Sequence, residues 1–137
     1  MNGHNPMRWN CSDRGCFNVK RRPKIEVFHD CFPRRISFGD VDGIVEINGK
    51  ALLLEWKSEP KPLPTGQRIM YERITKTGDL SVIIGCGDAE TMETLQMQTV
   101  FMGKFSEVKQ AALEDLKAAM RRWVSYASKN NSLRIAA

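Results

Sequence analysis

Apolar, β-prone residues on either side of Asn48-Gly49 form a pattern that is typical of a β-hairpin. Asn-Gly between two such runs is a strong hairpin signal, because a type I′ turn needs positive φ at both central residues. The pattern predicts strands over about 36–47 and 50–57, joined by a two-residue loop. In the register that this loop dictates, Ile47 pairs with Lys50 and the pairs further out follow in step.

The same register gathers charged side chains at the far end of the hairpin. Asp42 falls opposite Glu55, and Asp40 falls opposite Lys57. Because side chains alternate between the two faces of a strand, all four charged side chains are expected on one face. The other face is expected to form an apolar core layer, made of Val41, Val45, Leu52, Leu54 and Trp56.

The rest of the chain is divided by prolines, glycines and one long apolar stripe. Three prolines predict a loop over 58–66. Apolar residues at helical spacing predict a helix from about 106 to 129, capped by Ser106. The stripe consists of Val108, Ala112, Leu116, Ala119, Trp123 and Ala127. The other predicted elements are strands at 25–29, 81–86 and 98–102, a helix over about 66–77 between Thr65 as its cap and Gly78 as its stop, and a short helical turn within 89–96.

The opposed carboxylates of Asp42 and Glu55 indicate a cation site. Two carboxylates facing each other on one sheet face repel, and folding does not require that arrangement. Ligation by one or two carboxylates, with positions left for water and phosphate, is how Mg²⁺ is usually held. Lys57 beside them could polarise a phosphate or help to deprotonate the attacking water. The alternative interpretation is a solvated polar face with a cross-strand ion pair between Asp40 and Lys57.

The spacing D-x(12)-E-x-K across a predicted hairpin resembles the core of the PD-(D/E)XK nucleases, including the VRR-NUC and Holliday-junction-resolvase-like members. The resemblance covers residues 25–86 and lacks the family's proline, since Val41 precedes Asp42. It implies an α/β (α+β) fold of the restriction-endonuclease type, with a mixed central sheet flanked by helices and a hairpin that carries the active site.

The resemblance also implies roles for individual residues. Asp42, Glu55 and the main-chain carbonyl of Trp56 would hold Mg²⁺ or Mn²⁺, and Lys57 would act on the attacking water. Gln67, at the start of the following helix, matches a glutamine that lies beside the metal in related proteins. Asp40 is a candidate supplementary ligand. Glu26 is a candidate additional acid, because some members use a further acid upstream of the core aspartate.

Basic residues near these positions are candidates for nucleic-acid contact, since Lys and Arg neutralise phosphates. The candidates are Arg21, Arg22, Lys24, Arg34, Arg35 and Arg68. A separate hypothesis concerns zinc, because the pattern C-x4-C-x12-H-x-C could supply four ligands. Those ligands would be Cys11, Cys16, His29 and Cys31, with ordinary free thiols as the alternative, whereas Cys86 is expected in the core.

At 137 residues the chain is expected to form one nuclease-like domain, with a basic segment at 1–24, a catalytic core at 25–104 and a C-terminal helix and tail at 105–137. The net charge of +5 favours a polyanionic partner. No apolar run is as long as a membrane span and no signal-peptide core is evident, so a cytoplasmic location, with no membrane partner and with reduced cysteines, is expected. The compact chain resembles phage-encoded family members, which would place it in the host cytoplasm.

The resemblance therefore implies a metal-dependent deoxyribonuclease that hydrolyses phosphodiester bonds in DNA. If it is a structure-specific resolvase, a homodimer is expected, because two strands must be cut. Two alternatives stay open: a catalytically inactive nucleic-acid-binding module on the nuclease fold, and a zinc-stabilised interaction protein.

Overall fold

The computed structural model describes residues 23–129 of the chain. The chain divides into two compact units, Met1–Asp40 and Val41–Ala137. The described part of the first unit contains a 3-10 helix, η2, over Ile25–Cys31, so the strand predicted at 25–29 is wrong. Hydrogen bonds between residues three apart satisfy this backbone locally, as in the bond from Val27 N–H to the Lys24 carbonyl at 3.2 Å.

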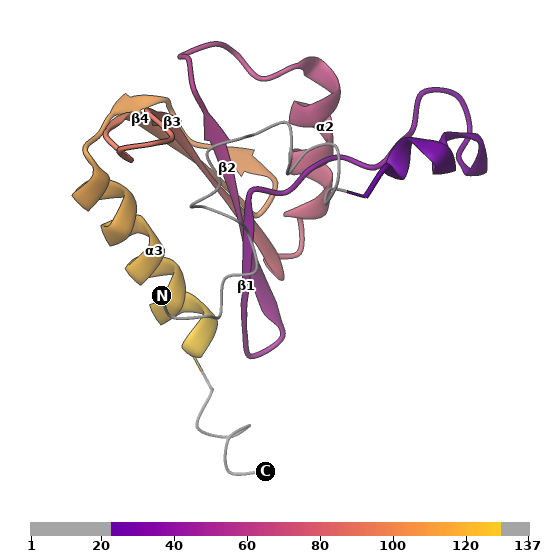
Figure 1. The fold of residues 1–137 in the computed structure, drawn as a ribbon. Helices are drawn as coiled ribbons and strands as arrows, with labels where there is room; N and C mark the ends of the chain where they lie inside the picture. Colours follow the sequence, from indigo (N-terminus) through magenta and orange to yellow (C-terminus); the bar gives the residue numbers. More distant parts are fainter. Residues whose placement is uncertain (1–22, 130–137) are drawn as a thin grey trace. The chain divides into compact units, whose positions relative to one another are not determined.

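The second unit is built on a six-stranded mixed sheet (Figure 1). The strand order is β1-β2-β3-β4-β5, with β6 also paired to β4. Strands β2 and β3 run parallel, and the other pairs are antiparallel. The coarse prediction of a mixed α/β fold is therefore confirmed. The elements are β1 (Gly43–Ile47), β2 (Lys50–Lys57), α2 (Thr65–Ile74), β3 (Leu80–Gly87), β4 (Thr94–Phe101), β5 (Lys104–Phe105), β6 (Lys109–Gln110) and α3 (Leu113–Ser128).

The predicted hairpin and its register are confirmed. Ile47 pairs with Lys50, and the register continues without a shift to the pair of Gly43 and Leu54. Asn48 and Gly49 have φ angles of 58° and 85°, as a type I′ turn requires. The first strand is shorter than the predicted 36–47, because β1 begins at Gly43.

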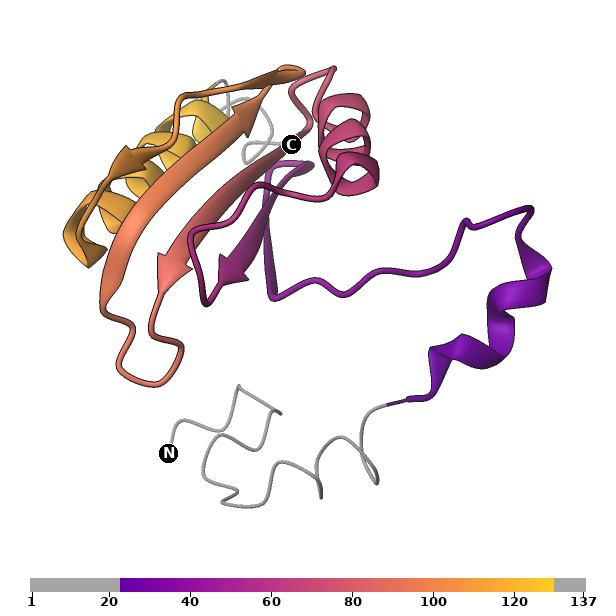
Figure 2. The ribbon, with the colours of Figure 1, turned by 90° about the horizontal axis from the view of Figure 1, so that it is seen from above.

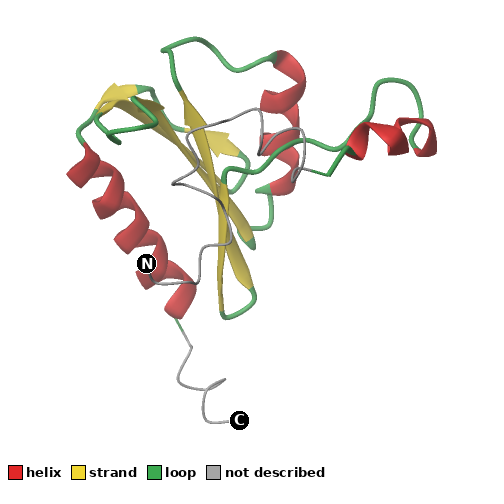
Figure 3. Ribbon diagram, in the orientation of Figure 1, coloured by secondary structure: helices red, strands yellow, loops and turns green. Residues whose placement is uncertain are grey.

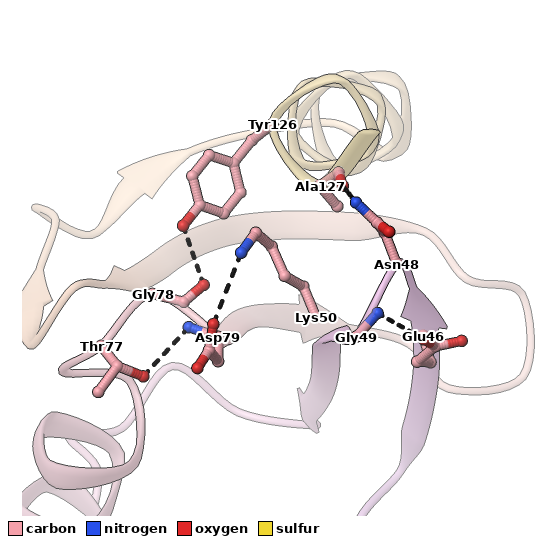
Figure 4. A network of polar contacts seen from close by, with 9 residues as sticks. All are labelled: Glu46, Asn48, Gly49, Lys50, Thr77, Gly78, Asp79, Tyr126 and Ala127. Carbon is pink, nitrogen blue, oxygen red and sulfur yellow. Dashed lines mark hydrogen bonds and ion pairs between the residues drawn. The ribbon is translucent and has the colours of Figure 1, made fainter. Parts of the chain in front are cut away.

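The hairpin turn is tied to the C-terminal end of α3 (Figure 4). The Asn48 side-chain amide donates to the Ala127 carbonyl at 3.4 Å. Nearby, the Tyr126 hydroxyl donates to the Gly78 carbonyl at 3.0 Å, and Lys50 forms an ion pair with Asp79 at 3.5 Å. These contacts fix the turn end of the hairpin, which is the end opposite to Asp42, Glu55 and Lys57.

Helices cover both faces of the sheet, with α3 on one side and α2 on the other (Figure 2). On the α3 face the core is made of Leu52, Ile83, Met97, Leu116, Ala119, Trp123 and Ala127. On the α2 face it is made of Leu53, Tyr71, Val82, Ile84 and Val100. Strand β2 is buried from both sides in its middle, which explains its continuous apolar run.

One position in the sheet is packed so closely that only glycine fits. Gly85 on β3 pairs with Trp56 on β2, and the Trp56 indole lies across it on the α3 face. A Cβ at position 85 would lie 2.7 Å from the Trp56 ring and 3.2 Å from Leu116. The missing side chain therefore lets the indole lie flat between the sheet and α3.

The end of α2 is held against the sheet by Thr75, which is fully buried. Its hydroxyl donates to the Tyr71 carbonyl at 2.7 Å and accepts from the Gly103 N–H at 3.0 Å. Because Gly103 lies in the turn between β4 and β5, this pair of bonds fixes the helix against that turn. A long loop without regular structure connects β2 to α2, as the prolines predict (Figure 3).

The structure corrects several predicted boundaries. Thr65 is the first residue of α2 and Pro64 takes the N-cap position without a side-chain cap, so the predicted cap is wrong. The helix ends at Ile74, before Gly78. The turn predicted within 89–96 is shorter than expected: the Met92 N–H donates to the Asp88 carbonyl at 2.8 Å, and β4 already begins at Thr94.

The long C-terminal helix begins later than predicted, and its first residues form strands. The Ser106 N–H donates to the Thr99 carbonyl at 2.8 Å and the Ser106 hydroxyl accepts from the Thr99 N–H at 2.9 Å, so this segment pairs with β4. Val108 is 54% exposed and lies outside the helix, whereas the stripe from Leu116 onward is buried as predicted.

The apolar face of the hairpin is also less buried than predicted. Leu52 is in the α3-side core, but Val41 and Val45 are 53% and 50% exposed. Strand β1 is at the edge of the sheet, where a single neighbouring strand covers it less completely. In the described part of the chain, 23–129, none of the helices combines the length and apolar character needed to cross a membrane.

Candidate active site

The end of β2 carries charged side chains on the face that α2 covers. Leu53, Glu55 and Lys57 share this face because they alternate along the strand. Leu53 is buried in the α2-side core, while Glu55 and Lys57 are half-buried. The face thus changes from core to open surface within four residues, near the N-terminal end of α2.

Asp42 lies beside this end of β2 through a side-chain bond. Its Oδ2 atom accepts the Trp56 N–H at 2.6 Å. In the hairpin register, the ladder partner of this N–H would be residue 41, but β1 begins only at Gly43. The carboxylate takes that place. Because the N–H and C=O of one residue point to the same side of a strand, the Trp56 carbonyl also faces the Asp42 side.

Glu55 is held from the opposite direction by helix α2. The Tyr71 hydroxyl donates to Glu55 Oε1 at 2.8 Å, and the Gln67 amide donates to the Tyr71 oxygen at 3.2 Å. Gln67 and Tyr71 are four residues apart, so they lie on one face of the helix. The structure therefore brings the predicted Gln67 to Glu55 through an intervening tyrosine.

Tyr71 is a site residue that sequence analysis did not identify. It is 4% exposed, and burial raises the pKa of its hydroxyl well above its ordinary value, with the neighbouring Glu55 carboxylate and the charge of Asp42 adding to the rise. The phenol thus stays a neutral donor to Glu55 throughout the physiological range. The signal that could have found it was the four-residue spacing from Gln67 at the start of a helix.

The raised pKa of Tyr71 predicts a measurable delay in its ionisation. The difference in absorbance at 295 nm between the wild type and Tyr71→Phe should show no tyrosinate from Tyr71 up to pH 11 in the native protein. In urea the same difference should titrate near 10.0, the ordinary value. Since the unfolded chain loses this proton at lower pH, the stability that the proton provides is complete below pH 10 and falls as pH rises further. A native midpoint near 10 would contradict the burial of Tyr71 and its contact with Glu55.

Lys57 is the remaining charged residue at this end of β2. It pairs with Cys86 in the β2–β3 ladder, and its ammonium forms no ion pair within residues 41–129. A half-buried ammonium without a carboxylate partner in that unit is able to bind an anion. Asp42, Glu55, Trp56, Lys57 and Gln67 are thus brought to one end of the sheet, as predicted.

Asp40 and Glu26 belong to the first unit, and their supplementary roles stay predictions. Both make interactions there or elsewhere in the chain. Glu26 lies on η2 rather than on the predicted strand. Among the basic candidates, Lys24, Arg34 and Arg35 are exposed residues of the first unit, and Arg21 and Arg22 lie outside the described residues. Arg68 is on α2, with its guanidinium 4.3 Å from the centre of the Phe105 ring.

The zinc hypothesis stays a prediction. His29 and Cys31 lie on η2, with the His29 Nδ1 atom 3.1 Å from the Glu26 carbonyl, and Cys31 is an exposed free thiol. Cys11 and Cys16 lie outside the described residues. Within residues 23–129, no three His, Cys, Asp or Glu side chains come together as a metal site. Cys86 is buried, as predicted.

No family model matches the chain, and no significant match is found among curated proteins or solved structures. The geometry described above is therefore the basis for assigning a function.

Proposed function

We propose that the protein is a metal-dependent nuclease that hydrolyses phosphodiester bonds in DNA, on a fold of the restriction-endonuclease type. One observation carries the proposal: each of the two carboxylates is anchored through a single oxygen. Asp42 is held at Oδ2 by the Trp56 N–H, and Glu55 is held at Oε1 by Tyr71. Within residues 23–129, the other oxygen of each has no hydrogen-bond partner. Two fixed carboxylates, each with one oxygen left over, are suited to share a cation.

The donor set fits a hard divalent cation. It consists of carboxylate oxygens and, on the same side of β2, the Trp56 carbonyl, with no sulfur or imidazole among them. Mg²⁺ prefers oxygen ligands and keeps several waters, so two carboxylates and a carbonyl are enough protein ligands. When bound, such an ion would lower the pKa of a coordinated water and neutralise charge on the phosphate.

The remaining residues supply positioning and positive charge. Tyr71 and Gln67 hold Glu55 in one rotamer, so that the carboxylate need not reorganise when an ion binds. The Lys57 ammonium, two residues along the same face, provides a positive charge for a non-bridging phosphate oxygen as negative charge develops there. The order of a hairpin, a helix and a further strand in a mixed sheet supports the proposed fold type, because the family resemblance implies a mixed sheet with a hairpin that carries the active site.

The test is cleavage of labelled single-stranded, duplex, nicked, flap and four-way-junction DNA with Mg²⁺, with Mn²⁺ and with EDTA. We expect cutting with either metal and none with EDTA. If the wild type binds these DNAs but cuts none, the proposal is wrong and the inactive binding module takes its place. Stoichiometric zinc without any Mg²⁺-dependent cutting or DNA binding would instead favour the interaction protein.

A further inference from the structure

A pocket of about 440 Å³ opens on the α2 face of the sheet, beside Lys57. Its floor is made of side chains from β2, β3 and β4, and its walls are the loop before α2 and the side chain of Arg68. The floor includes Lys57, Ile84, Cys86, Gln96 and Gln98. A volume in this range is typical of sites for small ligands.

The strand register makes this pocket continuous with the candidate active site. Lys57 pairs with Cys86, which pairs with Gln96. Residues directly opposite each other in neighbouring strands share a face, and neighbouring strands are about 4.8 Å apart. In the adjacent row Glu55 pairs with Ile84, which lines the pocket as well. A polymer whose phosphate lies at Lys57 and Glu55 can therefore place its next unit in the pocket.

The pocket combines an apolar floor with amide groups at its far side. Ile84 and Cys86 line the floor with the small part of each side chain that is exposed, 4% in both cases, and Pro62 and Leu63 add apolar atoms at the wall. The Gln98 amide nitrogen is fixed by a bond to the Ser106 carbonyl at 2.9 Å. The Gln96 amide has no hydrogen-bond partner within residues 23–129. An apolar surface beside an amide with both donors and acceptors suits a flat, aromatic ring with polar edges, such as a nucleobase.

Cationic side chains stand where the phosphates of such a ligand would lie. The Arg68 guanidinium is held over the Phe105 ring at 4.3 Å, which limits its movement and leaves its N–H groups able to contact a phosphate. Lys61 forms an ion pair with Glu59 at 3.3 Å, and both side chains are largely exposed, so the pair can exchange for a phosphate. With Lys57, three cations border the pocket.

We propose that this pocket binds one unpaired nucleotide next to the phosphate at the candidate active site, so that the preferred substrate is single-stranded DNA. The proposal rests on the proposed nuclease function. A stacked base in a duplex could enter a walled pocket only by flipping out, which costs a few kcal/mol, whereas a base in a single strand is already accessible.

The experiment measures binding of a fluorescent single-stranded 12-mer by anisotropy, in EDTA so that no cleavage occurs. Abasic residues replace the bases one position at a time. Because base stacking is worth roughly 1–3 kcal/mol, one abasic position should weaken wild-type binding about 5- to 150-fold more than its neighbours do. The matching duplex should bind more weakly and show no such position.

Gln96→Glu places a negative charge in the pocket with little change in size. It should weaken binding of the intact 12-mer at least fivefold and reduce the effect of the critical abasic position to less than twofold. The matched control is Leu95→Glu, which adds the same charge one residue away on the opposite face, at a side chain that is 54% exposed. The control should keep the full abasic effect, and both variants should melt within a few degrees of the wild type.

The outcomes separate this inference from the proposed function. Equal abasic effects at every position, an unchanged effect in Gln96→Glu, or no measurable binding of the 12-mer would overturn the pocket assignment. If the position-specific effect is present but the wild type cuts no DNA with either metal, the pocket assignment stands and the nuclease proposal fails. If the wild type cuts DNA with metal but shows no position-specific effect, the nuclease proposal stands and the pocket assignment fails.

Discussion

Replacing Glu55 with glutamine should lower Mg²⁺-dependent cleavage of DNA by roughly 10²- to 10⁴-fold. The substitution keeps the size of the side chain and an oxygen that can still accept from Tyr71. It removes the negative charge that the proposed cation site needs. Metal binding measured by calorimetry should weaken in parallel, while the thermal midpoint stays close to that of the wild type.

Lys57→Met should produce a loss of similar size by a different route. The ammonium is proposed to act on phosphate and water rather than on the cation, so the rate should fall while metal affinity is kept.

Glu46→Gln is the matched control for Glu55→Gln. Glu46 lies on the same sheet face near the turn, where its carboxylate accepts the Gly49 N–H at 2.7 Å. This variant should cut DNA at the wild-type rate, and a Glu55→Gln variant that did the same would contradict the proposed site.

Trp123→Ala should have the largest effect on stability, a loss of about 3–5 kcal/mol in the free energy of unfolding. Trp123 is 6% exposed and packs in the α3-side core with Leu116 and Ile83. Small domains have total stabilities of roughly 5–15 kcal/mol, so the variant should be partly unfolded in mild denaturant. Urea unfolding followed by circular dichroism measures the difference.

Two further variants check the reason for that loss. Val124→Ala changes the next residue of the same helix, which is 43% exposed, and should cost less than about 1 kcal/mol. In residues 23–129 the Trp123 indole nitrogen is buried without a hydrogen-bond partner. Trp123→Phe removes that N–H and keeps an aromatic ring, so it should cost less than half as much as the alanine variant. Equal losses for Trp123→Ala and Val124→Ala would contradict the assigned packing.

The hairpin could be predicted from the sequence because its information is local. Asn48-Gly49 specifies the turn, the turn specifies the register, and the register determines which residues face Glu55. The same reasoning could not find the bond from Tyr71 to Glu55. That contact depends on where α2 is placed over the sheet, and the placement is fixed by long-range contacts such as the bond from Gly103 N–H to Thr75.

The start of the last helix shows why a periodic pattern alone can mislead. Val108 and Ala112 continue the helical spacing of the stripe toward the N-terminus, and Ser106 precedes them as the predicted cap. In the structure, paired bonds with Thr99 turn the segment around Ser106 into short strands along β4. Pairing with β4, a partner that the local periodicity cannot reveal, therefore decides the conformation of this segment.

The contact between Trp56 and Gly85 has a consequence for how this protein tolerates change. Trp56 is joined by one peptide bond to Glu55, and the two side chains point to opposite faces of the sheet. A larger residue at position 85 would push the indole toward α3 on one face, and a shift of Trp56 would also move the adjoining Glu55, whose carboxylate lies on the other face. The packing under α3 and the proposed active site are thus coupled at this point, so changes in the packing around Trp56 should be limited by their effect on Glu55.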